Sequence, residues 1–164
     1  MEFESFVASH TRPQIEFHLA SAKARLSEEA YKQEESQIWL AYARRERPQR
    51  TVRVLLNLID KAQHQKKSSY KDVREIIGTD AHNENMVIIK AIGEICKIYR
   101  WPPYAVLIKT ETGNVGSGFF KDYGFGGSPI HLTLIEGAMD QLCFHSKPPE
   151  MIEVAEAVKA HFAR

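Results

Sequence analysis

The first half of the chain repeats apolar residues with the period of an α-helix. Residues three or four positions apart form one apolar face, namely Ile15, Leu19, Ala22 and Leu26. The segment from Thr11 to Gln14 is typical of a capping box, which predicts that this helix starts at Thr11. A further apolar face over residues 38–42 predicts another helix, which Pro48 is expected to end.

The pattern then predicts a further helix and, after it, two helices joined by a short link. A helix over residues 50–63 carries the apolar stripe Val52, Leu55, Leu56 and Ile59. After a basic connection, Ser69 to Asp72 forms a second capping box, and Gly78 suits the end of the helix that follows. Asp80 can cap the next helix, which runs to Tyr99. This arrangement is typical of a helix-turn-helix.

A β-hairpin is predicted directly behind the second helix. Pro102 and Pro103 stop that helix. Residues 104–109 are apolar and partly β-branched and predict a strand, residues 111–116 contain turn residues, and residues 117–120 predict the returning strand. A hairpin at this place is the wing of a winged helix-turn-helix.

The predicted fold class is therefore mainly α with a small β-hairpin. It comprises a helical N-terminal region at residues 1–67, a winged helix-turn-helix at residues 68–121, and a C-terminal loop and helix at residues 122–164. Within the last region, residues 129–136 fit a strand or a helix. The final helix follows Pro149, and its residues expected to face inward are Met151, Ile152, Ala155, Val158 and Phe162.

Three segments resemble the DNA-binding domain of alkylguanine-DNA alkyltransferases and alkyltransferase-like proteins. Residues 69–78, Ser-Tyr-Lys-Asp-Val-Arg-Glu-Ile-Ile-Gly, resemble the family's Ser/Thr-Tyr-x-x-Leu-Ala-x-x-x-Gly helix. Residues 90–93, Lys-Ala-Ile-Gly, resemble its Arg-Ala-Val-Gly segment, and residues 103–108 take the place of its Pro-Ile-x-x-Pro-Cys strand. The resemblance implies a phosphate contact for Tyr70, and for Lys90 it implies the position of the family's arginine finger.

The chain departs from this family at the residue that performs the chemistry. By spacing, the family's Pro-Cys-His-Arg becomes Leu-Ile-Lys-Thr at residues 107–110. Alkyl transfer requires an activated thiolate, which Ile108 cannot supply. Cys96 is expected on or near the buried face of the second helix. We therefore predict a protein that is not an enzyme and has no cofactor.

Positive charge is concentrated in the middle of the chain. Residues 41–100 contain 13 Lys and Arg against 7 Asp and Glu, whereas residues 1–40 contain 4 against 7. Around a helix-turn-helix, such an excess favours contact with phosphate, and polar residues at the second helix can read bases. The residues predicted to bind DNA are Lys66, Lys67, Ser69, Tyr70, Lys71, His82, Asn83, Asn85, Lys90, Lys109, Asn114 and Lys121.

The sequence thus predicts a non-catalytic protein that binds double-stranded DNA. A solvated surface charge is the alternative for each lysine taken singly, and capping is the alternative for His82, Asn83 and Asn85. At the level of function, one alternative is a protein-interaction module in which the N-terminal helices, with Trp39 and Tyr42, form a homodimer or partner surface. The other is a regulatory subunit of a bacterial or phage nucleic-acid-processing complex.

The cysteines and the hydropathy of the chain indicate the cellular compartment. Cys96 and Cys143 do not describe a disulfide framework, and free thiols favour a reducing compartment, which predicts a cytoplasmic protein. No apolar run approaches the roughly 18 residues that span a bilayer, so no membrane association is expected. His131, Cys143 and His145 are fewer than the four ligands of a structural zinc site, and no metal is predicted.

Overall fold

The computed structural model describes residues 2–78 and 84–163, and the chain forms two compact units, Met1–Arg47 and Pro48–Arg164. The first unit contains α1 (Phe3–Ser9), α2 (Arg12–Lys23) and the first part of α3 (Glu28–Gln63). The predicted start of α2 is confirmed, because the Thr11 backbone N–H donates to Gln14 Oε1 at 2.8 Å. Its small apolar core comprises Val7, Ile15, Leu19, Ile38 and Ala41.

The expected helix end at Pro48 is wrong, because Pro48 lies inside α3. A proline inside a helix costs about 3 kcal/mol, since it removes one backbone hydrogen bond and crowds the preceding turn. Buried apolar residues on either side of Pro48 offset this cost. Ile38 and Ala41 precede it in the core of the first unit, while Leu55 and Leu58 follow it in the core of the second.

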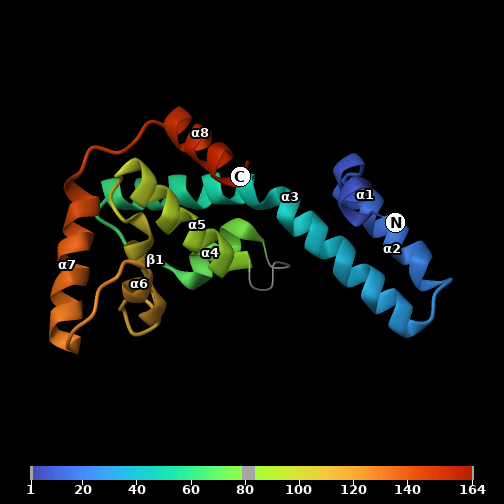
Figure 1. The fold of residues 1–164 in the computed structure, drawn as a ribbon, viewed down its shortest axis with the longest axis horizontal. Helices are drawn as coiled ribbons and strands as arrows, with labels where there is room; N and C mark the ends of the chain where they lie inside the picture. The colour runs from blue at the N-terminus through green and yellow to red at the C-terminus, as the bar shows by residue number, and fades with distance from the viewer. Residues whose placement is uncertain (1, 79–83, 164) are drawn as a thin grey trace. The chain divides into compact units, whose positions relative to one another are not determined.

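The second unit is mainly helical and has a two-stranded parallel sheet. Along the chain its elements are the second part of α3, β1 (Ser68–Ser69), α4 (Tyr70–Ile77), α5 (Glu84–Tyr99), a 3-10 helix η1 (Tyr104–Leu107), β2 (Ile108–Lys109), α6 (Ser117–Asp122), α7 (Pro129–His145) and α8 (Met151–Phe162). In Figure 1, α7 and α8 lie along two outer sides of this unit.

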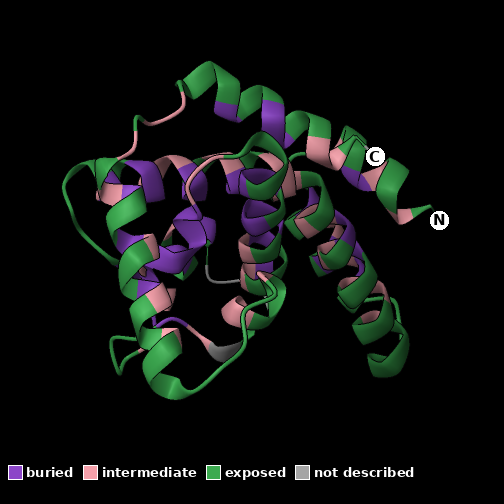
Figure 2. Cartoon of the chain, turned by 60° about the vertical axis from the view of Figure 1, so that its left-hand side comes forward, coloured by how far each residue is buried: buried purple, intermediate pink, exposed green. Residues whose placement is uncertain are grey.

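The core of the second unit combines residues that are far apart in the sequence. The apolar stripe of α3 meets α4, α5, η1 and α8, and the side chains that are fully inaccessible to solvent include Val54, Leu55, Leu58, Val73, Ile88, Ile92, Ile95, Val106, Leu107, Val154 and Val158. The burial colours of Figure 2 show these inward faces in purple and the outward faces in green.

The expected hairpin is largely wrong. Residues 104–107 form the 3-10 helix η1, and only Ile108 and Lys109 form a strand, which pairs in parallel with Ser68 and Ser69. The return from the turn is limited to one antiparallel bridge between Lys109 and Val115. Residues 104–108 are all buried, so they lack the alternation that distinguishes a half-buried strand from other apolar segments.

The predicted second strand of the wing is instead the helix α6. Its neighbouring residues Phe119 and Phe120 both pack against the core. A strand would turn two neighbouring side chains to opposite faces. A helical turn allows both rings to contact the core, which explains the conformation of this segment.

The C-terminal part contains two helices. Residues 129–136, which fitted either a strand or a helix, begin α7, and the Ser128 hydroxyl accepts a hydrogen bond from the His131 N–H at 3.4 Å. The predicted final helix is confirmed as α8, but part of its expected inward face is wrong. Met151 and Ile152 are 69% and 64% exposed, and Ala155 is also exposed, whereas Val154 and Ala157 are buried beside Val158.

Candidate nucleic-acid interface

Basic residues gather where the chain leaves α3 and enters α4. Gln65 adopts a left-handed backbone (φ 53°) and turns the chain toward β1. The predicted capping box of α4 is confirmed: Ser69 Oγ accepts from the Asp72 N–H at 3.1 Å, and Asp72 Oδ2 accepts from the Ser69 N–H at 3.0 Å. These bonds fix the first turn of α4, in which the side chain of Lys71 is exposed to solvent.

An open hollow of about 360 Å³ lies at this helix start. The residues that line it are Ser69, Tyr70, Lys71, Arg74, Lys109, Thr110 and Glu111. The hydroxyl of Tyr70 lies so close to Gly116 that a Cβ atom there would be 2.6 Å from it. Partial burial raises the pKa of Tyr70, so its hydroxyl stays protonated and can donate a hydrogen bond.

Three exposed cations at or shortly before the start of α4 have no carboxylate partner among the described residues, and two of them, Lys71 and Arg74, line this hollow. Within the described part of the chain, no ion pair involves Lys66, Lys71 or Arg74. Lys67 forms one with Asp140 at 3.2 Å, although its side chain is 51% exposed. Arg74 was missed by the sequence prediction. Its signal is the spacing of three residues from Lys71, which places both on one helix face.

The prediction that Lys109 contacts DNA from a wing is wrong. Lys109 is only 4% exposed. Its Nζ donates to Glu136 Oε1 at 2.7 Å and to Asp140 Oδ1 at 2.9 Å. Glu136 Oε1 also accepts a hydrogen bond from the Val115 N–H at 3.0 Å. Lys109 therefore joins β2 to α7 as part of a buried ion cluster and has no charge left to offer a phosphate.

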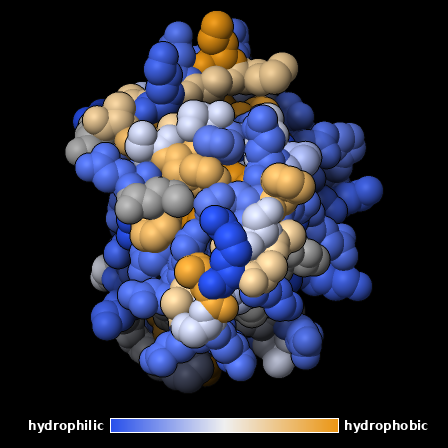
Figure 3. Space-filling view, turned by 90° about the vertical axis from the view of Figure 1, so that its right-hand side faces the viewer, coloured by the Kyte–Doolittle hydropathy of each residue, from blue (hydrophilic) through white to orange (hydrophobic). Residues whose placement is uncertain are grey.

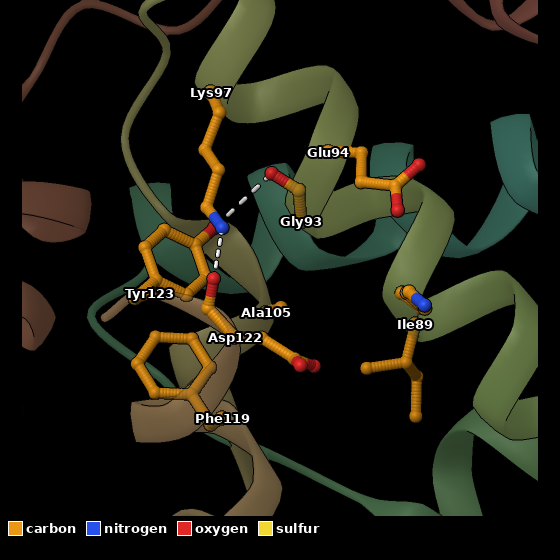
Figure 4. A pocket seen from close by; sticks show the side chains of 9 residues that line it. Ile89, Gly93, Glu94, Lys97, Ala105, Phe119, Asp122 and Tyr123 are labelled. Atoms are coloured by element: carbon orange, nitrogen blue, oxygen red, sulfur yellow. Dashed lines mark hydrogen bonds between the residues drawn. The ribbon is translucent and has the colours of Figure 1, made fainter. Parts of the chain in front are cut away.

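The other predicted residues lie in separate hollows. Lys90 lines a cavity of about 90 Å³ between α5 and α6. In Figure 4, the Tyr123 ring lies beside Phe119 at this cavity, and the Lys97 ammonium donates to the Asp122 carbonyl. Asn114 and Lys121 line a hollow of about 460 Å³ at the start of α7, together with Phe120 and Phe125.

The start of the second helix is only partly covered by the structure. The side chain of Asn85 is half-buried in the first turn of α5, and its Oδ1 has no hydrogen-bond partner among the residues that the structure describes. His82 and Asn83, the other predicted base-reading residues, lie outside those residues. The structure therefore brings Ser69, Tyr70 and Lys71 together and places Lys90, Asn114 and Lys121 elsewhere.

Trp39 and Tyr42, the aromatic residues proposed for a partner surface, contact other residues of the first unit. Trp39 and Tyr42 pack against its core, Arg12 lies over the Trp39 ring and Arg45 lies over the Tyr42 ring. Arg45 also donates to the backbone carbonyls of Val7 and His10. The face drawn in Figure 3 is mainly hydrophilic, and its hydrophobic residues appear in small separate groups.

Both cysteines are buried, as was predicted for Cys96 from its helix position. Burial in apolar surroundings raises the pKa of the Cys96 and Cys143 thiols to about 12. Neither thiol has the thiolate character that a nucleophile requires. Among the described residues, no group of three or more His, Cys, Asp and Glu side chains is placed to hold a metal ion.

We expect both thiols to resist modification in the folded protein. At pH 8 a pKa of about 12 in place of 9.0 lowers the thiolate fraction about 1,000-fold. A chromogenic disulfide reagent should react slowly with native protein and titrate two thiols in denaturant. Rapid labelling of the native protein would contradict this prediction.

The same two thiols should make the stability depend on pH. The folded state keeps their protons while the unfolded state loses them above about pH 9, so the free energy of unfolding should fall as the pH rises further.

Comparison of the chain with known protein families, with curated proteins and with solved structures found no match. None of the described helices combines the length and apolar character needed to cross a membrane.

Proposed function

We propose that this protein binds double-stranded DNA without catalysing a reaction on it, through the surface at the start of α4. The observation that carries the proposal is a pair of exposed cations, Lys71 and Arg74, which line one open hollow and have no carboxylate partner within the described residues. Lys66, also exposed and without such a partner among those residues, precedes them in the chain. Lys67 precedes β1 and adds a half-exposed charge that is paired with Asp140.

The chemistry of these groups suits phosphate. Lysine acts as a point charge toward phosphate oxygens, and the guanidinium of Arg74 can bind two oxygens at once. Ser69 and Tyr70, each of which carries a hydroxyl, line the same hollow. Contacts of this kind position a protein on the DNA backbone without reading its sequence. Glu111 lines the hollow as well and makes it less positive, so moderate affinity is expected.

Base reading is a separate part of the proposal. A recognition role for α5 requires Lys90 to reach a groove while the start of α4 holds the backbone, because the side-chain oxygen of Asn85 is buried and does not face a base. Lys90 is exposed, which suits this role, but it lies at a different hollow from Lys71. Asn114, in the turn before α6, and Lys121, on α6, lie at a third hollow.

Binding to a labelled duplex of mixed sequence across a salt series tests this proposal. We expect micromolar affinity at low salt, and each phosphate contact contributes a slope of about −0.9 in log K against log salt. The double variant Lys71→Ala/Arg74→Ala should lose at least about tenfold in affinity and show a shallower slope. A matched control, Lys147→Ala/Lys159→Ala, removes the same net charge from exposed positions after α7 and on α8.

The control separates a local interface from general attraction. Equal loss in the two double variants would show that net charge alone drives binding and would contradict an interface at α4. Absence of binding by the unaltered chain at low salt would contradict DNA binding altogether. Both variants change exposed side chains, and thermal unfolding should show that the fold is intact.

A further inference from the structure

The helix α7 buries its charged side chains and exposes apolar ones, which is the reverse of an ordinary surface helix. Its sequence contains only two charged residues, Glu136 and Asp140, and both are buried against Lys109. Large apolar residues lie on its outer side: Ile130 is 73% exposed, Leu134 66% and Leu142 51%. Figure 2, in which the side of the molecule that carries α7 comes forward, shows much of this helix coloured as exposed.

The exposed apolar residues form one continuous stripe. Ile130, Leu134, Ala138 and Leu142 follow at intervals of four residues, and all four are exposed. Gly137 lies beside Ala138 at the middle of the stripe. A Cβ atom added to Gly137 would meet nothing within 4 Å, so no contact within the chain requires a glycine there. Small residues at this place permit the close approach of a second helix.

We propose that α7 is a homodimer interface in which two copies of the chain pair their α7 stripes in antiparallel orientation. The stripe is its own complement in this arrangement. Leu134 and Leu142 lie four residues before and after Ala138, so a two-fold axis near Ala138 sets Leu134 against the partner's Leu142. Because the outer face carries no Asp, Glu, Lys or Arg, no like charges oppose one another across the axis.

The size of this surface predicts a weak, reversible dimer. A helix of 17 residues is about 25 Å long, and contact along one such pair of helices buries less than the roughly 1,200 Å² of the smallest standard interfaces. Micromolar dissociation is therefore expected. This inference does not rest on DNA binding, because the exposed stripe residues Ile130, Leu134 and Leu142 are not among the residues that line the hollow at α4.

Sedimentation equilibrium of the full chain tests the proposal over a range from low micromolar to several hundred micromolar. The average mass should rise with concentration from 18.7 kDa toward twice that value. Leu134→Glu should raise the dissociation constant about tenfold or more, because each dimer loses two buried leucines and gains two buried charges. Met151→Glu on α8, also at an exposed apolar residue, serves as the matched control and should leave it unchanged.

A pair of charge variants tests the orientation. Leu134→Lys and Leu142→Glu should each be monomeric alone, and an equimolar mixture should recover a dimer, because the antiparallel pairing sets the lysine against the partner's glutamate. A parallel pairing would set lysine against lysine or glutamate against glutamate in the single samples, and in the mixture each charge would face a leucine, so no lysine–glutamate pair would form. Three outcomes would overturn the proposal: the unaltered chain remains monomeric, Leu134→Glu dimerises with the same dissociation constant as the unaltered chain, or the mixture shows no dimer. Circular dichroism melts should match for all variants.

Discussion

Lys109→Met is expected to destabilise the folded chain by about 3–5 kcal/mol. The substitution keeps most of the side-chain volume but removes the only cation that contacts both buried carboxylates, Glu136 and Asp140, within the described residues. Glu136 would keep only the Val115 N–H and Asp140 only the half-exposed Lys67, so the loss of hydration of two buried carboxylates would be poorly compensated. Denaturant unfolding monitored by circular dichroism measures the change, and a loss below about 1 kcal/mol would contradict the structural role assigned to Lys109.

Two further variants separate charge pairing from packing. Lys67→Ala removes the half-exposed partner of Asp140 and should cost less than about 1 kcal/mol, because solvent screens such a pair. Adding Glu136→Gln and Asp140→Asn to Lys109→Met should recover most of the lost stability, since the buried charges disappear together. Glutamine at position 136 retains an acceptor for the Val115 N–H, which the native Glu136 provides. Failure of this rescue would assign the loss to packing.

Tyr104→Ala is expected to lower the free energy of unfolding by about 3–5 kcal/mol. Tyr104 is 1% exposed and lies at the start of η1 in the core of the second unit. Removing its ring leaves a cavity that the surrounding helices can fill only in part. The exposed Tyr99, which stacks on Trp101, is the matched control, and Tyr99→Ala should cost about 1 kcal/mol.

Thermal or denaturant unfolding of both tyrosine variants checks this expectation. Equal losses at the two positions would contradict the placement of η1 in the core. Tyr104→Phe adds a second test, because it keeps the ring and removes only the hydroxyl. It should retain most of the stability that Tyr104→Ala loses.

Local features of the sequence predicted local structure well. The capping boxes at Thr11 and Ser69 marked the starts of α2 and α4, since each depends on hydrogen bonds between residues three positions apart. The apolar stripe of residues 52–59 likewise predicted the helix that carries the core of the second unit. Gly78 was correctly placed at the end of α4, where its backbone has a φ of 102°.

The wing shows where the same reasoning failed. Residues 104–108 form an apolar run without alternation, and such a run does not distinguish a strand from a buried helical turn. The turn residues 111–116 do form a turn, with the Thr110 N–H bonded to the Asn114 carbonyl at 2.8 Å. The segment after that turn became helical because Phe119 and Phe120 both pack against the core.

The sequence by itself determined the helices that have capping residues and apolar residues at helical spacing. It also determined the burial of Cys96 and the concentration of cations before and within α4. Tertiary structure alone decided what each cation does. Lys109 and Lys71 were both predicted to bind DNA, but Glu136 and Asp140 lie 27 and 31 residues after Lys109 and meet it only once α7 has packed. A lysine is buried only where the fold brings it such partners, because an unpaired charge in the core is too costly.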